Sequence, residues 1–77
     1  METATPLKTE LRVFEHNREH WVREHPGKFV VIQGETILGD FFDEYADAFR
    51  AGLARFGVGR TFLVKQIWRT EPVYFIA

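Results

Sequence analysis

The stretch His25–Gly39 reads HPGKFVVIQGETILG, and it decides the fold. Pro26 cannot continue a helix and moves the residue before it away from the helical conformation, so the preceding helix is expected to end there. A run of four apolar residues then leads to Gly34, which can take the positive φ of a tight turn. The pattern predicts a β-hairpin with strands at residues 29–33 and 36–38.

Apolar residues on both sides of this hairpin repeat at helical spacing. Residues 7–24 carry the stripe Leu7, Leu11, Phe14, Trp21 and Val22. The second helix is expected to begin near Asp40 or Asp43, since either carboxylate is a suitable N-cap, and to end at Gly57. Its expected packed stripe is Tyr45, Phe49, Gly52, Leu53 and Phe56. Gly52 lies within that stripe, where the missing side chain allows a neighbour to approach closely.

Two further apolar runs, at residues 61–68 and 73–76, predict a second hairpin with a turn at 70–72. We therefore expect an α+β fold in the order α-β-β-α-β-β, with a mainly antiparallel four-stranded sheet packed by two helices. Residues 1–6 are expected to form a flexible lead, and residues 7–77 a single domain.

The amino-acid composition excludes several kinds of catalytic residue and binding partner. The chain has 77 residues, no Cys, no Ser and a formal charge of −1. Serine and cysteine nucleophiles and disulfides are therefore excluded, and the charge balance argues against a nucleic-acid partner. Neither a signal-peptide pattern nor an apolar run of about 20 residues is present, so we expect a soluble, cytoplasmic protein without a membrane partner.

The strand segments are apolar at consecutive positions, whereas a strand with one wet face alternates. One explanation is that the helices take opposite faces of the sheet, or that the first helix wraps across the second face. The explanation we favour is that a sheet face or edge meets another chain. The residues expected to form that contact surface are Phe62, Val64, Trp68, Tyr74 and Ile76, with Trp68 as the anchor.

Two alternative functions rest on other residues. His16 and His20 are four residues apart on one helix face with Glu24 one turn further, a spacing that can bind a divalent metal in a metal-dependent module or enzyme. Single-stranded nucleic acid could instead stack on Phe62 and Trp68 beside basic residues of the same strand. Alternation, however, places Lys65 on the face opposite Phe62, so the aromatic rings and the basic side chains lie on different faces.

The acidic residues around the second helix have a structural explanation. Asp40, Asp43, Glu44 and Asp47 complement the positive end of that helix, and no pattern marks them as catalytic. We therefore expect a non-enzymatic protein-interaction module without a cofactor. It would act as a homodimer or as a small accessory, adaptor or inhibitor subunit.

Several segments together resemble a group of short prokaryotic domains of unknown function. The likeness spans residues 14–68 and rests on His25–Val30, Gly34, Gly39, Ala48–Ala51, Phe56–Gly57 and Phe62–Ile67. The resemblance implies a helix, a Pro-Gly-Lys-aromatic-Val strand with a Gly turn, a second helix ending in Gly, and a closing apolar strand. It implies no established activity, cofactor or catalytic residue.

Overall fold

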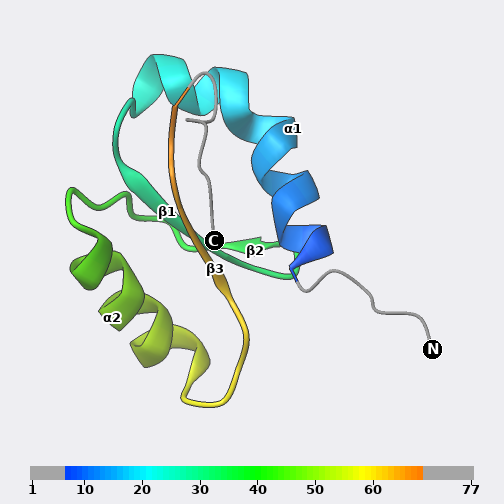
Figure 1. The fold of residues 1–77 in the computed structure, drawn as a ribbon, viewed down its shortest axis with the longest axis vertical. Helices are drawn as coiled ribbons and strands as arrows, with labels where there is room; N and C mark the ends of the chain where they lie inside the picture. Colours follow the sequence, from blue (N-terminus) through cyan, green and yellow to red (C-terminus); the bar gives the residue numbers. More distant parts are fainter. Residues whose placement is uncertain (1–6, 69–77) are drawn as a thin grey trace, which may run out of the picture.

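The computed structural model describes residues 7–68, which form two helices and three strands (Figure 1). In chain order these are α1 (Lys8–Glu24), β1 (Phe29–Gln33), β2 (Thr36–Ile37), α2 (Tyr45–Phe56) and β3 (Leu63–Gln66). The α+β class is confirmed, as are both helices and the first hairpin. No helix within residues 7–68 is long and apolar enough to cross a membrane.

The sheet has the order β2-β1-β3, and both strand pairs are antiparallel. β1 is the central strand, and its register sets Val31 opposite Val64 and Ile32 opposite Leu63. The predicted fourth strand, at residues 73–76, lies outside the described residues. The described sheet is therefore three-stranded, and β2 and β3 are its outer strands.

The junction between α1 and β1 follows the prediction from Pro26. The backbone N–H of His25 still donates to the carbonyl of Trp21, and the helix ends there. Gly27 then takes a φ of +80°, and its N–H donates to the carbonyl of Ile67 at 2.8 Å. A tight reversal thus brings β1 beside β3 directly after the helix.

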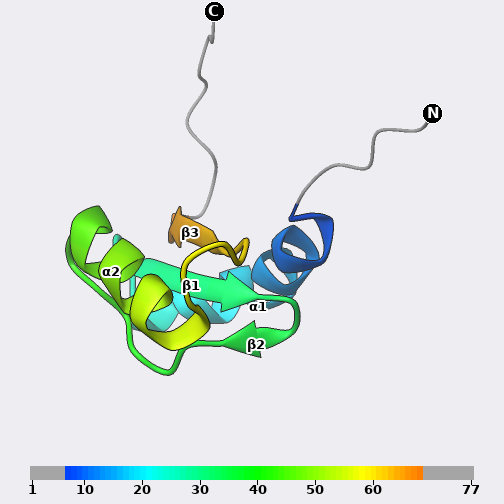
Figure 2. The same cartoon turned by 90° about the horizontal axis from the view of Figure 1, so that it is seen from below.

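The two helices cover opposite faces of the sheet, as Figure 2 shows with α1 and α2 on either side of β1. Phe14 and Trp21 of α1 pack with Val30, Ile32 and Ile67 in one buried cluster. Val31 is equally buried but points the other way, toward α2.

The expectation of a sheet face left open for a partner is therefore wrong, whereas contact through a sheet edge stays a prediction. The alternative weighed against it, one helix on each face, is what the structure shows. Consecutive apolar residues in β1 occur because the central strand is buried on both sides by helices of its own chain.

Gly52 allows α2 to lie close to the chain that leads into β3. A Cβ built on Gly52 would stand 2.6 Å from Cζ of Phe62, closer than real side chains approach. Gly52 and its neighbour one turn earlier, Ala48, are the buried residues of α2. The predicted close approach is confirmed, and Phe62 is the residue that makes it.

The start of α2 differs from the prediction. Glu44 occupies the N-cap position and makes no side-chain capping hydrogen bond. Asp43 pairs instead with Lys28 in the turn before β1. Phe42 is held by two backbone hydrogen bonds to Phe29, at 2.7 and 3.0 Å, and this bridge directs Asp43 toward Lys28 rather than toward the helix end.

Candidate protein-binding surface

Five aromatic rings form a continuous row along α2 and the strands that it covers. The ring centroids of successive members lie 5.8 to 6.1 Å apart. We call this set the aromatic row; in order along the surface its members are Phe29, Tyr45, Phe49, Phe62 and Phe56. Aromatic pairs at such separations attract one another, so the row is a defined surface rather than a set of independent side chains.

The centre of the row faces solvent. Tyr45 is 54% exposed and Phe49 is 41% exposed, and their rings are stacked with an interplanar angle of 13°. The sequence pattern placed both residues in the packed stripe of the second helix. The buried residues of α2 are instead the small residues Ala48 and Gly52, because they lie on the side of the helix that faces the sheet.

Two of the predicted contact residues lie on the α2 side of the sheet: Phe62, just before β3, is a member of the row, and Val64 belongs to β3 itself. Phe62 is partly buried and contacts Phe49 and Phe56, each at a centroid distance of 5.8 Å. Val64 is also partly buried and lies on the same face of the sheet as Val31. The other two predicted contact residues, Tyr74 and Ile76, lie outside the described residues.

Trp68, the predicted anchor, occupies a separate place at the end of β3. It is 44% exposed, and its indole lies over Gly27, where an added Cβ would stand 3.3 Å from the ring. Its carbonyl accepts a hydrogen bond of 2.9 Å from Arg18 of α1. One side of the indole is therefore held against the α1–β1 turn while the rest faces solvent.

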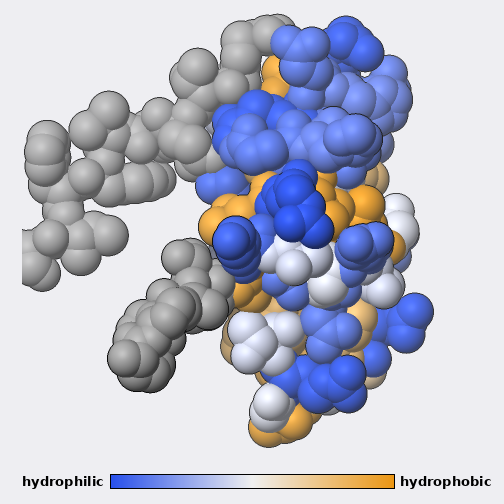
Figure 3. All heavy atoms as spheres, turned by 90° about the vertical axis from the view of Figure 1, so that its right-hand side faces the viewer, coloured by the Kyte–Doolittle hydropathy of each residue, from blue (hydrophilic) through white to orange (hydrophobic). Residues whose placement is uncertain are grey.

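The opposite face of the molecule is different in character. Seen from the side that α1 occupies, the upper part of the surface is predominantly hydrophilic (Figure 3). Two cations approach the buried ring of Phe14 there, since the Arg18 guanidinium carbon and the Lys65 ammonium each lie 5.1 Å from its centroid. Lys65 thus faces α1 while Phe62 faces α2. This separation does not favour base stacking beside basic residues.

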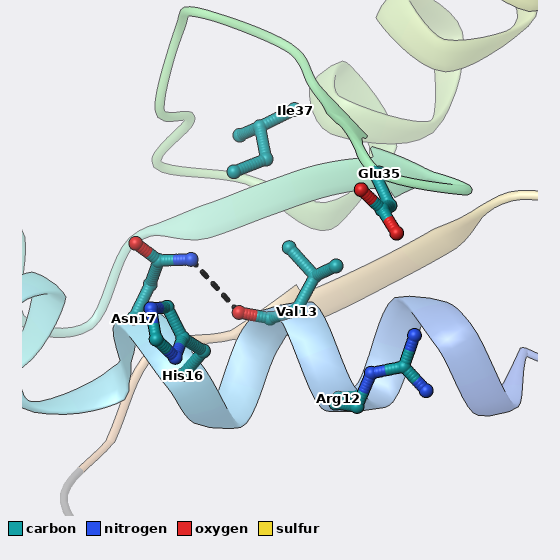
Figure 4. A pocket seen from close by; sticks show the side chains of 6 residues that line it. All are labelled: Arg12, Val13, His16, Asn17, Glu35 and Ile37. Carbon is teal, nitrogen blue, oxygen red and sulfur yellow. Dashed lines mark hydrogen bonds between the residues drawn. The ribbon is translucent and has the colours of Figure 1, made fainter.

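A shallow hollow of about 380 Å³ lies between α1 and the β1–β2 hairpin (Figure 4). Val13 extends from α1 toward the hairpin, and Ile37 lies across from it. The polar lining comes from Arg12, His16, Asn17 and Glu35. The Asn17 amide nitrogen donates to the Val13 carbonyl at 2.8 Å, so this polar group of the lining is already hydrogen-bonded within α1.

The hollow takes in only one of the candidate metal ligands. His16 lines it, whereas His20 and Glu24 are exposed further along α1 and are not part of its lining. Among residues 7–68, no group of three or more His, Cys, Asp or Glu side chains is placed to hold a metal ion. The geometry does not support the metal-dependent alternative.

Comparison of the chain with protein-family models, curated proteins and solved structures finds no match. The resemblance to short prokaryotic domains therefore stays a prediction, and the functional argument rests on the surface alone.

Proposed function

We propose that this chain is a small, non-enzymatic protein-interaction module that binds its partner at the aromatic row. The partner would be a second copy or a different protein that the module serves as an accessory, adaptor or inhibitor subunit. The observation that carries the proposal is the exposure of Tyr45 and Phe49 at the centre of the row.

The exposure of this stacked pair is the strongest support. Large aromatic side chains dominate the energetics of protein interfaces, and contiguous apolar patches on soluble proteins commonly mark such sites. Ala48 and Gly52 form the side of α2 that is buried against the sheet. The two exposed rings are therefore not required for the contact between α2 and the sheet.

The rigidity of the row is the second support. Phe49 rests on Phe62, and Tyr45 contacts Phe29 with their centroids 6.0 Å apart. A side chain that is already held loses less conformational entropy when a partner binds. Trp68, held by Arg18 and Gly27, would contact the partner at a separate place beyond the end of β3.

The proposal includes the finer part of the fold prediction. Residues 73–76 would add a fourth strand beside β3, because β3 is an outer strand of the described sheet. Tyr74 and Ile76 would then join Phe62 and Val64 near the row. A cytoplasmic location is part of the same proposal.

A matched pair of variants tests the function. The tagged full-length chain is used to capture proteins from an extract of the source cells, alongside Tyr45→Lys and Val58→Lys. Val58 is 89% exposed and follows α2 without belonging to the row, so it controls for a lysine placed on an apolar surface residue.

We expect a stoichiometric partner, either another protein or a differently tagged copy of this chain. Tyr45→Lys should reduce its recovery about tenfold or more, and Val58→Lys should leave it unchanged. Equal recovery by all three proteins, or no stoichiometric partner at all, would contradict the proposal. Circular dichroism confirms that each variant is folded.

A further inference from the structure

We infer that the outer edge of β2 binds an extended peptide segment of another protein, which adds a strand to the sheet and places neighbouring side chains in two hollows. This site is a sheet-edge contact separate from the aromatic row, so it goes beyond the proposed function. Three properties of the edge support it: the backbone groups of Ile37, a hollow on each face of the sheet beside β2, and the chemical character of the two linings.

The first property is the direction in which the backbone groups of Ile37 point. β2 is an outer strand of the described sheet, and Ile37 lies opposite Ile32 of β1. The N–H of the next residue, Leu38, donates to the carbonyl of Val31 at 2.9 Å. Bonded and non-bonded pairs alternate along an antiparallel ladder, so the N–H and C=O of Ile37 point away from β1. They are therefore placed to bond an added strand.

The second property is a hollow beside β2 on each face of the sheet. The hollow on the α1 side, of about 380 Å³, includes Ile37 in its lining (Figure 4). A second hollow, of about 510 Å³, lies on the α2 side and includes Leu38. Among the described residues, neither lining contains a residue of β1 or β3, so both hollows flank the edge of β2. Successive side chains of a strand point to opposite faces, so neighbouring peptide residues would enter one hollow each.

The lining of the α2-side hollow favours an apolar side chain. Most of it is apolar and comes from Leu38, Phe42, Ala51 and Ala54. Both alanines belong to α2, and their short side chains leave space between this helix and the chain that follows β2. Asp40 and Arg55 complete the lining. An apolar side chain of the peptide would be removed from water here.

The lining of the α1-side hollow favours an uncharged polar side chain. Figure 4 shows the Arg12 guanidinium directed from α1 toward the hairpin and the Glu35 carboxylate directed from the hairpin toward α1. Within residues 7–68, neither side chain forms a hydrogen bond or an ion pair. A charged peptide side chain would be attracted by one of the two groups and repelled by the other. The amide of Gln or Asn can accept a hydrogen bond from Arg12 and donate one to Glu35, so it suits both.

The same lining favours another protein over a second copy of this chain. Two copies bonded to each other through Ile37 about a twofold axis would place the two Ile37 residues opposite each other. Each isoleucine would then lie over the other copy's α1-side hollow and leave Arg12 and Glu35 without a polar partner. Residues 1–6 and 69–77 of this chain contain no Asn or Gln, so they do not supply the amide either.

The length of β2 predicts the strength of the contact. β2 has two residues, so the added strand makes few backbone hydrogen bonds and buries much less than the roughly 800 Å² per partner of a standard interface. We therefore expect a dissociation constant of about 10 µM or weaker.

Selection of random octapeptides displayed on phage, with the full-length chain immobilised, tests the inference. Enriched peptides should carry Gln or Asn next to a large apolar residue. The most enriched peptide, synthesised with a fluorescein label, is then used to measure dissociation constants by fluorescence anisotropy. N-methylation of each peptide N–H in turn should weaken binding by about tenfold or more only at positions that face β2, and alternate positions should change little.

A matched pair of variants locates the peptide. Ala54→Trp fills the α2-side hollow and should weaken binding of the labelled peptide by about tenfold or more. Ala46→Trp places the same side chain on an exposed alanine of α2 outside both linings and should leave binding unchanged. Hydrogen exchange of the Ile37 amide should slow when the peptide binds, whereas that of the Leu38 amide, already bonded to Val31, should change less.

A charge change in the α1-side hollow tests the predicted amide. Arg12→Glu makes both charged groups acidic, so a peptide with Lys in place of its amide residue should bind this variant about fivefold or more tightly than the amide peptide does. The wild type should show the opposite order. The same order in both proteins would overturn the assignment of the amide to this hollow.

The remaining outcomes separate this site from the aromatic row. Failure to enrich any peptide, or binding that Ala54→Trp leaves unchanged, would overturn the inference. Tyr45→Lys should leave peptide binding unchanged. If it abolished binding, the peptide would lie on the aromatic row, which would overturn this inference and leave the proposed function standing. Self-association that Ala54→Trp abolishes, without peptide binding, would make a second copy the occupant and would also overturn it.

Discussion

The two helices pack on the same sheet but differ in the kind of side chain that they expose to solvent. Every exposed residue of α1 is charged or polar, while Phe14 and Trp21 are buried. In α2 the buried residues are small, and Tyr45 and Phe49 are exposed. The apolar residues of α1 are accounted for by the core. Those of α2 exceed what its own sheet covers, and this excess is what points to a binding surface.

The strongest test of this contrast compares one phenylalanine from each helix. Phe14 has no exposed surface, so Phe14→Ala should lower the free energy of unfolding by about 3–5 kcal/mol. Phe49→Ala should cost about 1 kcal/mol or less, because its ring is already 41% exposed. Urea denaturation at low protein concentration, where association does not contribute, measures both.

Equal losses in the two variants would show that α2 packs as tightly as α1, and the contrast would fail. If Phe14→Ala does not fold, Phe14→Leu should still show a loss of about 1–2 kcal/mol, larger than that of Phe49→Leu.

A smaller effect is expected where α2 touches the chain leading into β3. Gly52→Ala forces a methyl group against Phe62, and overpacking of this kind costs about 1–3 kcal/mol, partly offset by about 1 kcal/mol from the better helix propensity of Ala. Gly39→Ala is the matched control, since nothing lies within 4 Å of a Cβ added there.

Combining Gly52→Ala with Phe62→Leu should cost less than the sum of the two single changes, because the smaller side chain makes room for the methyl group. Additive losses would mean that this contact does not set the distance between α2 and β3. Thermal melting of the four proteins gives the comparison.

The smallest effect is expected where α1 meets the β1–β2 turn. The Glu10 carboxylate accepts a hydrogen bond of 2.6 Å from the backbone N–H of Gly34. Glu10→Ala should cost about 1 kcal/mol and speed hydrogen exchange of the Gly34 amide. Thr9→Ala is a neighbouring control. Unchanged exchange at Gly34 would show that the carboxylate does not hold the turn.

Much of the fold could be predicted from local chemistry. Pro26 ended α1 where expected, Gly34 turned the hairpin, and Gly52 marked a close contact of α2. The first two are properties of one residue and its own backbone, and the third needs only the position of Gly52 within the apolar stripe, although its contact, Phe62, lies in another segment. The capping prediction was wrong: α2 begins at Tyr45 with Glu44 at the N-cap, and Asp43 pairs with Lys28, fifteen residues earlier.

The candidate surface could be predicted only in part from the sequence. Phe62, one of the residues predicted for the contact surface, is a member of the row, but Tyr45 and Phe49 were assigned to the packed stripe. Their spacing shows that they share a side of the helix, and the same spacing is consistent with burial or exposure. The one available signal was that the helix carries three large aromatic residues beside the small residues Ala48 and Gly52.

The sequence by itself determined the two helices, the hairpin and their order, because these depend on periodicity and on turn residues close in the chain. Only the tertiary structure decided which apolar residues are core and which are surface. That choice depends on which face of the sheet each helix covers, and a sheet apolar on both sides is compatible with either arrangement.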